Sequence, residues 1–183
     1  MSYLVFFALM LSLSSGSALS GQSSLVGRVS NHMDGSAVAG AFVIARWTHY
    51  GSNFFGSRAS CSHIEITRSD AQGRFVIPLA ESEEPQVTAY MPGFDAYRTE
   101  SSTDEVLELV PFTGAKESRD KALWWIGSLS GCKDNDIFAT LRPLYQAVDE
   151  ERRSLGLPAH AVDSLDYGVR LRREEQERAR TTK

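Results

Sequence analysis

The sequence contains little cysteine and no excess of basic residues, and these two absences limit what the protein can do. Its 183 residues include two cysteines, Cys61 and Cys132, and carry a formal net charge of −4. A general nucleic-acid binder needs a basic stripe that neutralises phosphates and releases their counterions. We therefore expect no nucleic-acid partner.

The motifs of several common catalytic and nucleotide-binding sites are also absent. The sequence has no G-x-x-x-x-G-K-[ST] loop, which would cradle phosphates. It has no G-x-S-x-G turn, which would expose a nucleophilic serine. We therefore expect neither catalytic residues nor a cofactor.

A long apolar run occurs at the N-terminus, at residues 3–13 (YLVFFALMLSL), without a lysine or arginine before it. Small residues follow it as far as Ser20, and this order predicts a secretory signal over residues 1–20. A buried strand or helix is the alternative. The run is shorter than the roughly 20 residues of a membrane-spanning helix. We expect a periplasmic or secreted protein with no membrane span after signal removal.

The two cysteines form an even pair, which in an oxidising compartment predicts a disulfide between Cys61 and Cys132. The loop that it would close is long, so the chain-entropy contribution would be about 4 kcal/mol, less any strain. The alternative is two separate buried thiols.

Short β-prone runs separated by turn residues fill residues 23–113. Asp34-Gly35 and residues 70–73 are typical turns, and the run at residues 42–45 is apolar on both faces, as in a strand covered on each side. Turn signals every 8–12 residues or so predict a β-sandwich of about seven strands. The expected strands are residues 25–30, 38–47, 61–67, 74–79, 85–91 and 104–112, with a long loop at residues 48–60.

After residue 113 the pattern of short β-prone runs ends, and residues 114–183 are predicted to form a helical extension. Apolar residues recur at spacings of three and four, which is one face of a helix. Helices are expected at residues 116–129 and from about Thr140, because Pro143 is tolerated in a first turn and not inside a helix. Charges of alternating sign at the end predict a solvated or frayed helix, and the end of the chain is a candidate for disorder.

Several segments, in order, are similar to carboxypeptidase regulatory-like domains. They are residues 26–29 (VGRV), Asp34-Gly35, 38–43 (VAGAFV), 67–78 (TRSDAQGRFVIP) and 87–94 (VTAYMPGF). The resemblance implies a mainly β chain: a seven-stranded transthyretin-like or Ig-like β-sandwich, followed here by the helical extension. It resembles the stand-alone exported bacterial type and implies an accessory module. It implies no peptidase activity, because the H-x-x-E signature is missing.

His63 and Glu65 lie two residues apart on an expected strand and therefore share a face. With His49 or Asp70 they could bind a metal, and a small metal-dependent hydrolase using His63 and Glu65 is one alternative function. The apolar residue Ile64 between them is typical of a strand with an outward polar face. We expect no metal site.

The expected loop at residues 48–60, together with the residue before it, contains a candidate binding surface. Its members are Trp47, His49, Tyr50, Phe54, Phe55 and Arg58. Aromatic rings beside a guanidinium group suit a protein or carbohydrate ligand. The alternative is that these side chains pack beneath the helical extension.

We therefore expect a non-enzymatic exported accessory or binding module of the cell envelope. The other alternative is a structural partner protein that docks through its helical tail, with residues 123–126 (LWWI) as the surface. An exposed Trp124–Trp125 surface in the monomer would favour that alternative.

Overall fold

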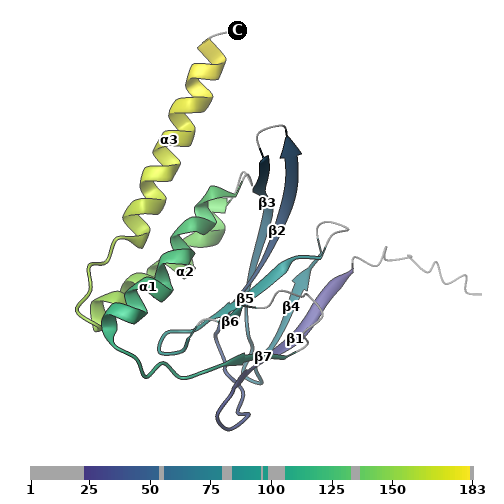
Figure 1. The fold of residues 1–183 in the computed structure, drawn as a ribbon, viewed down its shortest axis with the longest axis vertical. Helices are drawn as coiled ribbons and strands as arrows, with labels where there is room; N and C mark the ends of the chain where they lie inside the picture. The colour runs from purple at the N-terminus through teal and green to yellow at the C-terminus, as the bar shows by residue number, and fades with distance from the viewer. Residues whose placement is uncertain are drawn as a thin grey trace, which may run out of the picture.

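The computed structural model describes residues 23–53, 56–79, 84–95, 97–98, 106–132 and 137–181. Within these residues, two β-sheets pack together and a layer of helices covers one of them (Figure 1). The expected signal at residues 1–20 lies outside the described residues. None of the described helices is long and apolar enough to cross a membrane.

The first sheet has three strands in the order β4-β1-β7. The strands are β1 (Ser24–Asn31), β4 (Arg74–Pro78) and β7 (Val106–Leu109). β1 pairs antiparallel with β4 and parallel with β7. This sheet forms the outer layer of the sandwich.

The second sheet has four strands in the order β3-β2-β5-β6, and its neighbouring strands are antiparallel. The strands are β2 (Phe42–Asn53), β3 (Gly56–Arg68), β5 (Gln86–Tyr90) and the two-residue β6 (Tyr97–Arg98). β2 and β3 form a long hairpin, so the expected loop at residues 48–60 is wrong. The pairing continues through polar and glycine residues because the backbone bonds of a ladder do not depend on apolar side chains.

The four-stranded sheet is buried on both faces. One face packs against the three-stranded sheet through a core that includes Val43, Ala45, Trp47, Val87 and Ala89. The other face packs against the helices through Phe42, Ile44, Ile64 and Tyr90. This arrangement confirms the prediction that the apolar run at residues 42–45 belongs to a strand covered on each side.

The connection from β1 to β2 passes from one sheet to the other. The Asp34-Gly35 turn is present, and Ser30 forms an isolated antiparallel bridge with Ala37. Gly40 then has a φ of 76°, which a residue with a side chain rarely adopts, and the chain turns into the second sheet. The expected strand at residues 38–47 therefore begins only at Phe42.

The helical layer consists of α1 (Lys116–Gly127), the 3₁₀ turn η1 (Ser128–Gly131), α2 (Ile137–Ser154) and α3 (Ala161–Thr181). α2 begins before the expected Thr140, and Pro143 lies inside it. The cost of a proline within the helix is offset by the full burial of Ile137 and Leu141 ahead of it.

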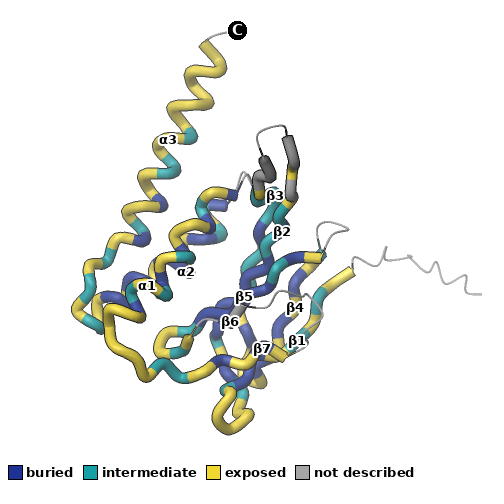
Figure 2. Tube along the Cα trace, in the orientation of Figure 1, coloured by how far each residue is buried: buried dark blue, intermediate teal, exposed yellow. Residues whose placement is uncertain are grey.

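The three helices hold about as many residues as the strands, so the mainly β description fits only the first part of the chain. The helices bury their sheet-facing sides, and the far end of α3 is exposed as it extends beyond the rest of the molecule (Figure 2). The charged residues 173–181 therefore form a solvated helix, as the alternating charges predict.

Candidate functional site

The most exposed apolar side chain of the helical layer, within the described residues, is Trp124, with 78% of its surface accessible. It lies on α1 between Leu123 and Ile126, which are both buried against the sheet. Leu123 and Ile126 are three residues apart and share the buried face of the helix, whereas Trp124 lies on a different face. Trp125 is half-buried at the edge of the core. The expected apolar surface at residues 123–126 is thus reduced to Trp124.

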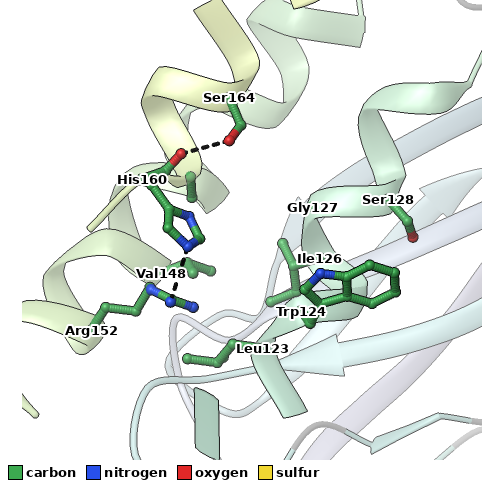
Figure 3. Close-up of a pocket in the computed structure, with 10 residues that line it drawn as sticks. Leu123, Trp124, Ile126, Gly127, Ser128, Val148, Arg152, His160 and Ser164 are labelled. Atoms are coloured by element: carbon green, nitrogen blue, oxygen red, sulfur yellow. Dashed lines mark hydrogen bonds between the residues drawn. The ribbon is translucent and has the colours of Figure 1, made fainter. Parts of the chain in front are cut away.

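A hollow of about 360 Å³ lies beside Trp124 (Figure 3). Leu123, Ile126 and Val148 form its floor, the Trp124 indole forms one wall, and Arg152 and His160 form the opposite wall. We call this hollow and its continuation, described below, the Trp124 groove. It combines an apolar floor with a few convergent polar groups, which is the usual composition of a ligand site.

The wall opposite Trp124 is held in place by its own hydrogen bonds. The Nε atom of Arg152 donates to the Pro158 carbonyl at 2.6 Å, and its Nη2 atom lies 3.2 Å from Nε2 of His160. The same Nη2 atom forms an ion pair with Asp120 at 2.5 Å. The side chain of Arg152 is only 6% exposed, so these contacts present a fixed edge to the groove.

A second hollow of about 290 Å³ continues from the first across Asp120 and Lys121. It shares Trp124, Arg152 and His160 with the first hollow. The groove therefore has an apolar part over the helix core and a charged part over the first half of α1.

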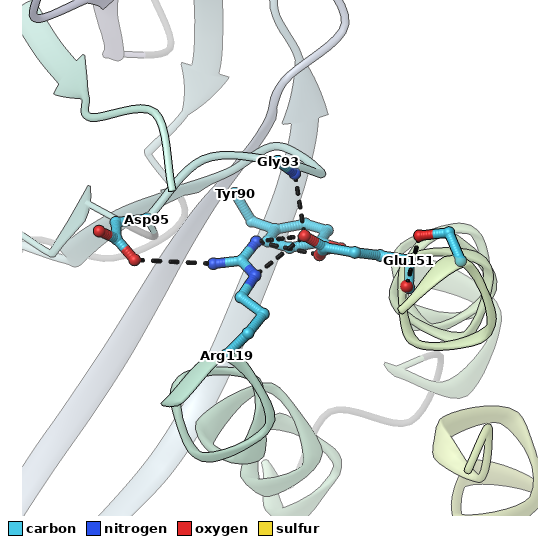
Figure 4. Close-up of polar contacts among 6 residues, drawn as sticks. Tyr90, Gly93, Asp95, Arg119 and Glu151 are labelled. Carbon is cyan, nitrogen blue, oxygen red and sulfur yellow. Dashed lines mark hydrogen bonds and ion pairs between the residues drawn. The ribbon is translucent and has the colours of Figure 1, made fainter. Parts of the chain in front are cut away.

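A buried polar cluster holds the helices on the sheet (Figure 4). Arg119 of α1 donates to both carboxylate oxygens of Glu151 of α2, each at 2.9 Å. The same carboxylate accepts the Tyr90 hydroxyl at 2.7 Å and the Gly93 backbone N–H at 2.9 Å. Burial raises the pKa of Tyr90 well above its ordinary value, and the hydrogen bond to Glu151 raises it further. This cluster ties α1, which carries Trp124, and α2 to β5 and the turn after it.

Cys61 of β3 and Cys132 after η1 form a disulfide, with their Cα atoms 4.5 Å apart. This confirms the predicted pairing. The bridge fastens the edge of the four-stranded sheet to the segment between α1 and α2. A structural disulfide is typical of extracytoplasmic proteins.

The structure does not gather the predicted binding surface around Trp47. Trp47 is fully buried in the sandwich core, because it lies on the face of β2 that meets the three-stranded sheet. His49 is exposed on β2, and Tyr50 and Arg58 lie on the two strands of the hairpin. Phe54 and Phe55 lie outside the described residues. Trp47 is therefore a core residue and is not part of a binding surface.

His63 and Glu65 share a face of β3, with Nε2 of His63 3.1 Å from Oε1 of Glu65. They lie on the same side of the sheet as Trp47, whose ring centroid is 5.2 Å from that of His63. This side meets the other sheet, so the expectation of an outward polar face is wrong, and both residues are half-buried. In the part of the chain that the structure describes, no three His, Cys, Asp or Glu residues gather as a metal site.

Asp70, the third residue considered for hydrolysis, has a structural role in the turn after β3. Its carboxylate accepts the backbone N–H of Gln72 at 2.9 Å and that of Arg74 at 2.8 Å. The hydrogen bond from the Arg74 backbone holds the pKa of Asp70 below its ordinary value. The interactions of Asp70 fix the turn that carries the chain from β3, in the four-stranded sheet, to β4, in the three-stranded sheet.

Sequence reasoning missed Arg119, Glu151, Arg152 and His160. A signal was present for the first three, because Arg119 lies four residues before Leu123, and Glu151 and Arg152 continue the apolar spacing of α2. Charged residues at positions of a buried stripe predict a buried ion pair. No comparable pattern marks His160, which lies in the connection before α3.

No family model matches the chain, and no curated protein matches it. Among solved structures, the shaft pilin spaA from Lactobacillus rhamnosus GG is similar at 14% identity, over 50% of this chain and 46% of that one, with a TM-score of 0.33. Its C-terminal domain alone gives 14% identity, over 49% of this chain and 97% of that one, with a TM-score of 0.32. The match thus spans less than half of that solved pilin chain. The comparisons do not support the carboxypeptidase regulatory-like assignment, and the β-sandwich stands on this structure.

Proposed function

We propose that this chain is a non-enzymatic exported module that docks onto a partner protein through its helical layer. The sandwich acts as the scaffold, and the Trp124 groove is the contact surface. The single observation that carries the proposal is the exposure of Trp124 beside a hollow with an apolar floor. Tryptophan is enriched among the residues that dominate protein interfaces, and it anchors best next to a pocket.

The rigidity of the surroundings supports this assignment. The Arg119–Glu151 pair holds α1 itself, and the Cys61–Cys132 bridge holds the segment that follows it. The helix that carries Trp124 is therefore rigidly attached to the sheet. A preorganised surface loses less entropy when a partner binds. The exposed indole of Trp124 contributes little to the buried core, so folding alone does not explain its position.

The groups with shifted pKa values support a non-enzymatic role. Tyr90 and Tyr145 both have pKa values raised by burial, and both donate hydrogen bonds inside the core. Asp34 and Asp70 have lowered pKa values because they accept hydrogen bonds in turns. Each of these pKa shifts is caused by burial or by hydrogen bonds that stabilise the fold, and none requires a catalytic role.

Export is the remaining part of the proposal. The disulfide suits an oxidising compartment, and the apolar start of the sequence suits a secretory signal. These two features support a periplasmic or secreted protein.

Photo-crosslinking in living cells tests the docking. A photoreactive amino acid replaces Ser128, an exposed residue that lines the groove, and the matched control carries it at Met33, which is 72% exposed on the sandwich. We expect one discrete adduct from position 128, none of that mass from position 33, and loss of the adduct when Trp124→Ala is added. Adducts that are equal at both positions, or that persist in Trp124→Ala, would contradict the proposal.

A further inference from the structure

The two parts of the Trp124 groove differ in chemistry, and together they restrict what the groove can hold. The apolar part is a hollow of about 360 Å³ floored by Leu123, Ile126 and Val148. These three side chains are at most 2% exposed, so the floor is set by the core and does not depend on flexible residues. A single large apolar group inserted between Trp124 and Arg152 would be covered on several sides.

The charged part has more cations than anions. Arg152 and Lys121 line it, and Asp120 is the acid that faces them. Asp120 is already paired with Arg152 at 2.5 Å. Among the interactions of the described residues, none pairs the exposed ammonium of Lys121. The residues that line this part therefore carry one net positive charge, although the whole chain carries a net charge of −4.

The two parts meet at Trp124, Arg152 and His160, which line both hollows. A ligand that fills both parts must carry its apolar group directly beside its negative charge. Polypeptide meets this condition when a large apolar residue is next to Asp or Glu. The exposed indole of Trp124 suits such a segment, because it can cover an apolar side chain with its ring face.

We propose that the groove binds a segment of the partner protein in which a large apolar side chain is flanked by carboxylates. The apolar side chain lies on Leu123 and Val148 beneath Trp124. The carboxylates lie toward Lys121 and the edge formed by Arg152. This inference rests on the proposed function, because it names the chemistry of the partner at the same surface.

Peptide titration tests the chemistry directly. Three blocked pentapeptides of one design are compared: leucine flanked by glutamates, leucine flanked by lysines, and alanine flanked by glutamates. Binding to the mature disulfide-bonded protein is followed through the NMR signal of the Trp124 indole N–H. We expect the glutamate–leucine peptide to bind at least tenfold more tightly than either of the others.

Protein variants locate the two contacts. Trp124→Ala should abolish binding of the glutamate–leucine peptide, followed by calorimetry. Lys121→Glu should weaken binding about threefold to tenfold, because it replaces an attraction with a repulsion at an exposed site. Lys116→Glu, which changes the same charge at the start of α1, is the matched control and should change the affinity less than twofold. Equal losses in the two lysine variants would overturn the placement of the carboxylates.

The possible failures separate this inference from the proposed function. If the crosslink at position 128 forms and depends on Trp124, but the lysine-flanked peptide binds as well as the glutamate-flanked one, docking stands and the acidic partner is wrong. If dodecanoate binds and the peptides do not, the groove holds a lipid and the inference is overturned. Concentration-dependent dimerisation that Trp124→Ala abolishes would assign the groove to a second copy and overturn it as well.

Discussion

Arg119 and Glu151 form a bidentate ion pair that is almost completely buried between the helices and the four-stranded sheet. The Arg119 side chain is 0% exposed and that of Glu151 is 6% exposed. Both oxygens of Glu151 also accept hydrogen bonds from β5 or the turn after it, through the Tyr90 hydroxyl and the Gly93 N–H. One carboxylate thus joins two helices and a sheet, and its removal should affect all three.

Breaking this pair should strongly destabilise the protein. Glu151→Gln leaves the buried Arg119 charge with only the exposed carboxylate of Asp95, 3.9 Å from its Nη1 atom. Breaking a buried pair in this way costs about 3–5 kcal/mol. The double variant Arg119→Met with Glu151→Met should lose less than the sum of the two single variants, since it leaves no buried charge. Urea denaturation of the wild type, Glu151→Gln, the single variants Arg119→Met and Glu151→Met, and the double variant measures these differences.

The surface pair Arg142–Asp166 is the matched control, because its side chains are 44% and 51% exposed. Asp166→Asn should cost less than about 1 kcal/mol, as is usual for exposed pairs. If Glu151→Gln were as mild as Asp166→Asn, the buried pair would not be what holds the helices on the sheet.

Stability should fall as the pH rises above the ordinary tyrosine value of 10.0. Burial raises the pKa values of Tyr90 and Tyr145 in the folded protein, so the unfolded chain releases these protons first. Below pH 10 the contribution of these groups is fully present. Above it, each group should remove about 1.4 kcal/mol per pH unit, up to the folded pKa. Urea midpoints measured between pH 8 and pH 11 check the slope.

Tyr145→Phe separates the two contributions. Its hydroxyl donates to the Ile126 carbonyl at 2.8 Å, so the variant should lose some stability at every pH. The decline above pH 10 should also become shallower, because one of the two shifted groups is gone. A slope identical to that of the parent protein would mean that Tyr145 ionises normally in the fold.

The sandwich could be predicted from the sequence because its signals are local. Turn residues such as Asp34-Gly35 and Asp70 act on their immediate neighbours, and the apolar run from Phe42 shows coverage on both faces without knowledge of the partner layers. The disulfide could be predicted because only two cysteines are present. These features need no knowledge of long-range contacts.

The candidate site could not be predicted in the same way, because it depends on which side of each strand or helix faces a neighbour. Side chains alternate between the two faces of β2, and Trp47 lies on the face that packs in the sandwich core. Trp124 lies on α1 just outside the buried face of that helix. Both are tryptophans beside apolar residues, so composition does not distinguish them. Arg152 and His160 meet only because the turn after α2 brings them together.

Removing the disulfide should lower the stability by about 4 kcal/mol, because the bridge joins residues 71 positions apart and restricts the unfolded chain. The double variant Cys61→Ala with Cys132→Ala should therefore unfold at a lower urea concentration. Wild-type protein kept under reductant is the matched comparison and should show a similar midpoint. If oxidised and reduced proteins unfold at the same urea concentration, the bridge contributes nothing to the fold.

Asp149 of α2 should be required for the start of α3. Its buried carboxylate accepts the backbone N–H groups of Ala161 and Val162 at 2.8 and 3.0 Å, which caps α3 from a different helix. Asp149→Ala should cost about 1–2 kcal/mol, because both N–H groups lose their partner. Hydrogen exchange should accelerate over the first turns of α3. Asp163→Ala, an exposed change in the same first turn, is the control and should leave these amides protected. Equal protection in the two variants would mean that the cap is not formed by Asp149.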